Sequence, residues 1–306
     1  MRHRVEAGAD ALAAYLDTER QAVEAALLRA IEELAASLPS DVAAAVRHGV
    51  TGGGKRLRPV LCAGAYAACG GGTSAAVYDL SASLELIHAY SLMHDDLPCM
   101  DDADLRRGRP TTHKEHGEAV TKRAGAALIP MAALQALAAC ERLGCEPKVS
   151  KAVTAVLLRA AGAGGMVGGQ WVDLEGEGMS LGSADLDDLH RRKTGALLAA
   201  SLEMGALAAG AEDVVVDAFR AYGRAIGLAF QIVDDVLDAT QSAETLGKNP
   251  SDVAHGKSTY VSLHGLDEAR RRARAESDRA GAALTEAGID APMLAALARF
   301  VVERQS

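Results

Sequence analysis

The stretch AFQIVDDVLD, residues 229–238, decides the fold class because it sets acidic residues into an otherwise apolar helical pattern. Asp234 and Asp238 are four residues apart, so they share one face of a helix. Two carboxylates at this spacing repel each other, and their apolar surroundings add a desolvation cost. We therefore expect a cation to balance them. Oxygen ligands suit a hard ion such as Mg²⁺, which usually takes one or two carboxylates and completes its shell with substrate phosphates.

The helical pattern extends over the rest of the chain. Apolar residues recur at three- and four-residue spacing, as in Leu12, Leu16, Val23, Leu27, Ile31 and Leu34. Breakers rich in glycine and proline divide the sequence into around ten helical segments. No stretch alternates polar and apolar residues for long enough to predict a strand, and no linker of biased composition divides the chain. The sequence predicts an all-α protein with a single domain over residues 1–306.

Composition excludes several classes of protein. Apolar residues make up 49% and charged residues 24% of the 306 residues, which predicts a folded chain with a large core. A net charge of -9 argues against nucleic acid as a partner. The N-terminal stretch lacks the continuous apolar segment of a secretory signal. The cysteines form neither a CxxC pair nor a zinc pattern, which favours reduced thiols in the cytoplasm; they are Cys62, Cys69, Cys99, Cys140 and Cys145.

One uncharged run, from Ala124 to Cys140, raises the question of a membrane span. A span usually needs about 20 predominantly apolar residues, and this run is shorter and contains Pro130 and Gln135. We therefore predict a buried core helix here and no membrane span.

A second acidic cluster, HDDLPCMDDAD at residues 94–104, follows a helical run from Ser81 to Met93. Pro98 is expected to break or kink that helix. In an uninterrupted helix Asp95 and Asp101 would lie roughly 120° apart. We infer that the insertion of Leu97 and Pro98 lets Asp101 reach the same ion as Asp95. One acidic cluster alone could be a solvated helix end, but two clusters within apolar helical stretches favour a metal site.

Basic residues beside glycines interrupt this acidic chain in four places. Glycine permits close backbone approach, arginine binds phosphate oxygens bidentately, and lysine contributes a point charge. Each group alone is weak evidence because it could be an ordinary solvated helix end. Together with Mg²⁺ ligands they indicate that the substrate carries diphosphate. The first three groups are residues 53–59, 105–108 and 191–195, and the fourth consists of the two pairs at 247–248 and 256–257.

With these residues assembled, the chain resembles the short-chain trans-isoprenyl diphosphate synthases, specifically the bacterial farnesyl and geranylgeranyl diphosphate synthases. The resemblance implies an all-helical bundle of the isoprenoid synthase type around a deep central cavity. It also implies a homodimer and three Mg²⁺ ions that bridge both aspartate motifs to an allylic diphosphate. The motifs that carry it run in order from about Lys55 to Lys257: GGKRLRP at 53–59, DDLPCMDDADLRRG at 95–108, GGQWVDL at 168–174, KTG at 193–195, FQIVDDVLD at 230–238 and GKSTY at 256–260.

The resemblance also implies a role for individual residues. The metal site would comprise Asp95, Asp96, Asp101, Asp234, Asp235 and Asp238, with Asp96 and Asp235 in support. The allylic diphosphate would be bound by Arg106, Lys193, Thr194, Gln231, Lys248 and Lys257, of which the four charged residues would be catalytic. Isopentenyl diphosphate would be bound by Lys55, Arg58, His88 and Arg107. By sequence alone, a helical histidine such as His88 is more often a packing residue, and only its position seven residues before Asp95 promotes it.

The implied reaction is Mg²⁺-dependent head-to-tail condensation of isopentenyl diphosphate with dimethylallyl or geranyl diphosphate. It would release farnesyl diphosphate and pyrophosphate, chiefly through electrostatic stabilisation of the leaving group. Bulk at Tyr90 and Ser91 should limit the product, and an aromatic residue at Tyr90 resembles the farnesyl-type enzymes. A geranylgeranyl product is the alternative.

Two other functions fit the sequence less well. A terpene cyclase does not need an isopentenyl diphosphate site, so the GGKRLRP motif argues against it. A non-catalytic partner subunit typically loses an aspartate motif, and both are present here.

The family usually has an aspartate where this chain has Ala126, between Gly125 and Ala127. We expect this change to alter local packing or capping rather than to abolish activity.

Overall fold

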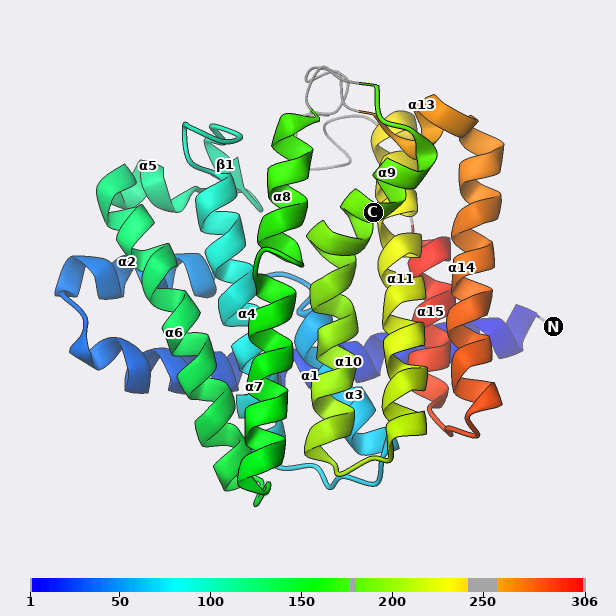
Figure 1. The fold of residues 1–306 in the computed structure, drawn as a ribbon, viewed down its shortest axis with the longest axis horizontal. Coiled ribbons are helices and arrows are strands. Elements are labelled where there is room, and N and C mark those ends of the chain that lie inside the picture. The colour runs from blue at the N-terminus through cyan, green and yellow to red at the C-terminus, as the bar shows by residue number, and fades with distance from the viewer. Residues whose placement is uncertain (1, 177–179, 242–257, 305–306) are drawn as a thin grey trace.

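The fold is a bundle of α-helices, seen in a computed structural model that describes residues 2–176, 180–241 and 258–304 (Figure 1). The all-α prediction is confirmed, and the described ranges contain fourteen α-helices rather than about ten, because several are short. The helices are α1 (Arg2–Leu34), α2 (Ser40–Val50), α3 (Leu57–Ala68), α4 (Ala75–Asp95), α5 (Thr112–His116), α6 (Glu118–Arg142), α7 (Pro147–Ala161), α8 (Met166–Glu175), α9 (Ser183–His190), α10 (Ala196–Ala208), α11 (Asp213–Thr240), α13 (Tyr260–His264), α14 (Leu266–Glu286) and α15 (Pro292–Glu303).

Four further elements are short. A 3₁₀ turn, η1 (Ala35–Ser37), follows α1, and a π-helical turn, η2 (Arg191–Gly195), joins α9 to α10. Two strands of two residues each, β1 (Leu105–Arg106) and β2 (Arg109–Pro110), form an antiparallel hairpin. This hairpin was not predicted from the sequence.

The long helices stand side by side, and α1 runs across them (Figure 1). Helix α4 packs against α6, α10 lies between α3 and α11, and α11 packs against α14. The motifs therefore reach one end of the bundle on two central helices, α4 and α11, which carry the first and second aspartate clusters near their C-terminal ends.

Three apolar clusters hold these helices together. The largest joins α1, α2, α4, α6 and α7, and includes Leu84 and Leu128. A second surrounds the first half of α11 at Phe219 and Tyr222. A third packs α9, α13 and α14 against the second half of α11. Because fully burying a large apolar side chain contributes about 1.5–3 kcal/mol, the second and third clusters hold α11 in place next to its acidic residues.

Small residues let α11 approach the π-helical turn closely. A side chain at Gly227 would collide with the backbone of Gly195. This contact places α11 directly against η2, the turn that carries Lys193.

Two stretches, Glu118–Arg142 and Pro147–Glu175, are long and apolar enough to cross a membrane by length and composition alone. About half of the most apolar window of each is buried inside the bundle, 50% and 44% respectively. The uncharged run contributes Ala124, Leu128 and Ala132 to the largest apolar cluster, as expected of a core helix.

The structure corrects the expectation for Ala126. This residue is exposed on α6, in the helix interior and not at a cap. Ala126 therefore does not cap a helix, and the close approach in this turn belongs to its neighbour Gly125, where a side chain would collide with His94.

Candidate active site

The first aspartate motif lies where α4 ends. Asp95 is the last residue of the helix, and Asp96 is its C-cap. The backbone N–H of Asp101 donates to the carbonyl of Asp95 at 2.9 Å, so the loop folds back over the helix end. The helix stops before Pro98 because a residue that precedes proline disfavours the helical conformation. The predicted return of Asp101 toward Asp95 is thus present in the structure.

The environment of Asp95 disfavours its charged form. Burial raises the pKa of Asp95 to about 6, the charge of Lys193 opposes this rise, and the charge of Asp101 adds to it. Such a carboxylate gains from a neighbouring cation, which is the chemistry expected of a Mg²⁺ ligand. Among the described residues no three acidic, histidine or cysteine side chains are close enough to hold a metal by themselves.

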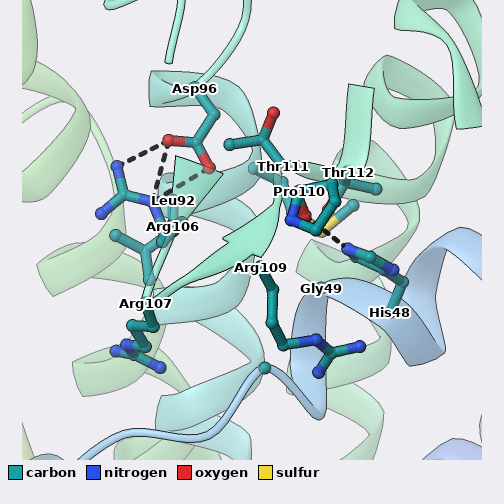
Figure 2. Close-up of a pocket in the computed structure, with 12 residues that line it drawn as sticks. His48, Gly49, Leu92, Asp96, Arg106, Arg107, Arg109, Pro110, Thr111 and Thr112 are labelled. Atoms are coloured by element: carbon teal, nitrogen blue, oxygen red, sulfur yellow. Dashed lines mark hydrogen bonds and ion pairs between the residues drawn. The ribbon is translucent and has the colours of Figure 1, made fainter. Parts of the chain in front are cut away.

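Arg106 is held by the hairpin and bound to Asp96. Arg107 and Gly108 both have positive φ, 55° and 74°, as the two-residue turn of a tight hairpin requires. Arg106 then points toward Asp96, and Arg107 points the other way (Figure 2). The guanidinium of Arg106 contacts both carboxylate oxygens, with Nη2 to Oδ1 at 2.6 Å and Nε to Oδ2 at 2.9 Å. Asp96 is buried and its carboxylate is paired with Arg106. We therefore keep the prediction that Asp96 supports the metal site rather than binding the ion directly.

Three of the four residues predicted to bind isopentenyl diphosphate lie in one basic cluster: Arg58, His88 and Arg107. Burial lowers the pKa of His88 well below its usual value, and the charges of Arg58 and Arg107 lower it further. The imidazole is therefore neutral beside two cations. The Nε of Arg58 is buried and has no hydrogen-bond partner among the described residues, while Arg107 donates to the carbonyl of Gly53. A partly desolvated set of guanidinium donors suits a doubly charged anion. The fourth residue, Lys55, is exposed and lies within electrostatic reach of Arg304 and of Asp234 in the second motif.

Arg56, within the same motif, has a structural role. Its buried side chain pairs with Glu24 at 2.7 Å and Glu85 at 2.5 Å, and donates to the carbonyl of Val50. These bonds hold a backbone with positive φ at Arg56 and so fix the start of α3, which carries Arg58.

Lys193 is positioned by the GGQWVDL motif. Its ammonium group donates to Asp173 of α8 at 2.6 Å. A side chain at Gly169 would collide with the backbone of Lys193, so α8 and η2 touch only because this residue is glycine. No role was predicted for Asp173 or Gly169, although the motif that contains them was recognised.

A polar cavity of about 100 Å³ lies beside Lys193. Gln231 and Asp235 of α11 line it together with His190 of α9. Thr194, the next residue of η2, is partly buried. The structure thus brings Lys193 and Gln231 together, as predicted. Lys248 and Lys257, also predicted to face the allylic diphosphate, lie outside the described residues.

The carboxylates of the second motif have different partners. Asp234 forms an ion pair with Arg304 at 2.6 Å, and the same guanidinium stacks over Phe230, 3.9 Å from the ring centroid. Asp235 is buried and accepts a hydrogen bond from the backbone N–H of Tyr260 at 2.7 Å. Asp238 lies one turn further along α11 and is partly buried. No sequence pattern marked Arg304, because it lies 70 residues from its partner.

The two residues predicted to limit product length differ in bulk and contacts. The ring of Tyr90 packs edge-on against His94 with centroids 4.8 Å apart, and burial and the nearby charge of Asp95 raise the pKa of Tyr90. The hydroxyl of Ser91 turns back to the carbonyl of His88. Tyr90 therefore supplies most of the bulk on this side of α4.

The chain is similar to known proteins over most of its length. The model of the family described as polyprenyl synthetase matches residues 39–287. A geranylgeranyl pyrophosphate synthase 11, chloroplastic, of Arabidopsis thaliana is 41% identical, over 92% of this chain and 82% of its own. A geranylfarnesyl diphosphate synthase, chloroplastic, of Leucosceptrum canum is 45% identical, over 77% and 65%.

Solved structures of similar proteins have the same fold. An FPP/GFPP synthase from Zymomonas mobilis has 36% identity and a TM-score of 0.81, and the match covers 96% of this chain and 99% of that one. A geranyltransferase from Legionella pneumophila has 31% identity and a TM-score of 0.85, with 97% and 98% covered.

Proposed function

Because the chain belongs to the polyprenyl synthetase family and is a prenyltransferase that makes prenyl diphosphates, we propose that it condenses isopentenyl diphosphate with dimethylallyl and geranyl diphosphate. We propose farnesyl diphosphate as the main product and Mg²⁺ as the cofactor. The observation that carries the proposal is the environment of Asp95, a carboxylate destabilised by burial that lies within the electrostatic reach of both Asp101 and Lys193.

The residues suited to hold the metal are Asp95 and Asp101 on the first motif and Asp234 and Asp238 on the second. Mg²⁺ bound there would supply positive charge to the departing pyrophosphate. Asp96 and Asp235 would act in support, through Arg106 and Tyr260 respectively.

The basic side chains divide between the two substrates. Lys193, already oriented by Asp173, and Arg106 would bind the allylic diphosphate and stabilise charge as it leaves. Arg58 and Arg107, together with the neutral His88, would hold isopentenyl diphosphate so that its double bond faces the allylic carbon. Loss of a proton to the released pyrophosphate would then complete the product.

The product is proposed to be farnesyl diphosphate because Tyr90 is a bulky, partly buried ring close to the first motif. Geranylgeranyl diphosphate is the second candidate, favoured by the names of the relatives. Measuring product length separates the two.

We also propose a homodimer in the cytoplasm. Large apolar side chains are exposed on α6, α7 and α8, which lie next to one another: Leu134, Leu137, Leu158, Val167 and Trp171 (Figure 1). A second copy of the chain would cover them. Light scattering of the purified protein tests this, and a monomer would contradict it. All five cysteines are free, as suits a reducing compartment.

Assay of the purified chain tests the enzymatic proposal. With Mg²⁺, isopentenyl diphosphate and geranyl diphosphate, we expect a C15 product, and we expect Asp95→Ala and Asp234→Ala each to lower kcat at least a hundredfold. The exposed Asp185→Ala variant serves as the control. Absence of any prenyl product from the unaltered chain would refute the proposal.

A further inference from the structure

His190 is a buried polar residue whose bonding capacity is unused. It ends α9, its exposed fraction is only 7%, and neither ring nitrogen has a hydrogen-bond partner among the described residues. Leaving a buried donor or acceptor unpaired costs about 1–3 kcal/mol. Such a group in a folded protein calls for an explanation, often a functional one.

The surroundings of His190 point to the second aspartate motif. Its Nε2 lies 3.8 Å from Oδ2 of Asp235, just beyond hydrogen-bond distance. The ring stacks on Tyr260 with centroids 5.7 Å apart and an interplanar angle of 18°. Tyr260 itself donates its backbone N–H to the same Asp235 oxygen, and its hydroxyl bonds Asp187 of α9. Asp235 thus has one fixed contact to α13 and one incomplete contact to α9.

His190 also borders the cavity where Lys193 and Gln231 lie. Lys193 follows three residues later in the same helical segment, whereas Asp235 lies on α11 beside Asp234. A bond between His190 and Asp235 would therefore tie the element that carries Lys193 to the element that carries the second motif. These are the two sides between which a diphosphate would sit.

We propose that His190 is a positioning residue for the second aspartate motif. When diphosphate is bound, a ring N–H of His190 donates to the Asp235 carboxylate. This inference rests on the proposed function, since it concerns the same site. The bond fixes Asp235 from the α9 side and so sets the distance between Lys193 and the carboxylates of α11.

Three variants test the role of the ring N–H. His190→Phe keeps a flat ring against Tyr260 but removes the donor, and His190→Gln restores an N–H donor without the ring. His264→Phe is the matched control, because His264 also contacts the Tyr260 ring, at 5.9 Å, but bonds Ser183 instead of Asp235.

The readouts are binding of inorganic pyrophosphate, measured by calorimetry with and without Mg²⁺, and steady-state kinetics. Loss of a residue that orients a metal ligand typically weakens metal-dependent binding by about 10–100-fold. We expect H190F to weaken Mg²⁺-dependent pyrophosphate binding about tenfold and to lower kcat similarly, with an unchanged KM for isopentenyl diphosphate. H190Q should recover most of both losses, and H264F should match the unaltered enzyme.

Unchanged pyrophosphate binding in H190F would overturn the proposal, as would an H190Q variant that loses as much as H190F. If H190F does not fold, His190→Leu takes its place in the comparison with H190Q. The unaltered enzyme is assayed alongside. If it makes no prenyl product, the proposed function fails; if it makes product and H190F behaves identically, only the role of His190 fails.

Discussion

Substituting Asp95 by asparagine should stabilise the metal-free protein while it abolishes catalysis. The pKa of Asp95 is raised from 3.8 to about 6, chiefly by burial. The ionised carboxylate therefore destabilises the folded state at neutral pH. A shift of this size corresponds to at most about 3 kcal/mol, and partial exposure of the residue reduces the expected effect to about 1–2 kcal/mol.

The sign of the pH dependence follows from the raised pKa. Below about pH 4 the group is protonated in both the folded and the unfolded state, so Asp95→Asn should change little. Between about pH 4 and pH 6 the unfolded chain has lost a proton that the native protein still holds, so the stability of the native protein falls across this range and levels off above it. The stabilisation by D95N should therefore be full at pH 8 and nearly absent at pH 4.

Urea unfolding in the presence of a chelator at these two pH values measures the effect. The neighbouring Asp102→Asn is the control, because the Asp102 side chain is 63% exposed. Equal or lower stability of D95N at pH 8 would refute the reasoning that burial penalises this carboxylate. A stabilised variant without activity would show that the motif sacrifices stability for metal binding.

Three further substitutions test other contacts. Tyr90→Ala should shift the product from C15 toward C20 or longer, since it removes the bulk beside His94; an unchanged C15 distribution would contradict this. Gly169→Ala should lower kcat at least tenfold because the new methyl group displaces Lys193, whereas Gly164→Ala, with open space around it, should have little effect. Arg304→Gln should destabilise the metal-free protein by about 1 kcal/mol and lower the Mg²⁺ concentration needed for half-maximal activity, because a competing cation leaves Asp234. A higher Mg²⁺ requirement would count against that competition.

The sequence predicted those features of the site that depend on local geometry. Asp234 and Asp238 share a helix because residues four apart always do, and the surrounding apolar periodicity was strong. The return of Asp101 over the end of α4 followed from Pro98. The basic cluster around His88 was predicted through the family resemblance, because a helical histidine has no distinctive spacing of its own.

The remaining contacts depend on which side chains meet in space. The contact between Arg106 and Asp96 was not predicted. Arg304 reaches Asp234 from the last described helix, and Asp173 orients Lys193 from a different helix. These pairs lie 10, 70 and 20 residues apart, so no helical or strand periodicity could reveal them.

Product analysis of the purified chain tests the central claim most directly. The protein is incubated with geranyl diphosphate and labelled isopentenyl diphosphate, with Mg²⁺ or with a chelator, and the dephosphorylated products are separated by chain length. We predict farnesol from the Mg²⁺ reaction and no prenyl alcohol longer than the C10 starting material with the chelator. Elongated product in the chelator reaction, or none in the Mg²⁺ reaction, would contradict the assignment of the two aspartate motifs as a metal-dependent diphosphate site.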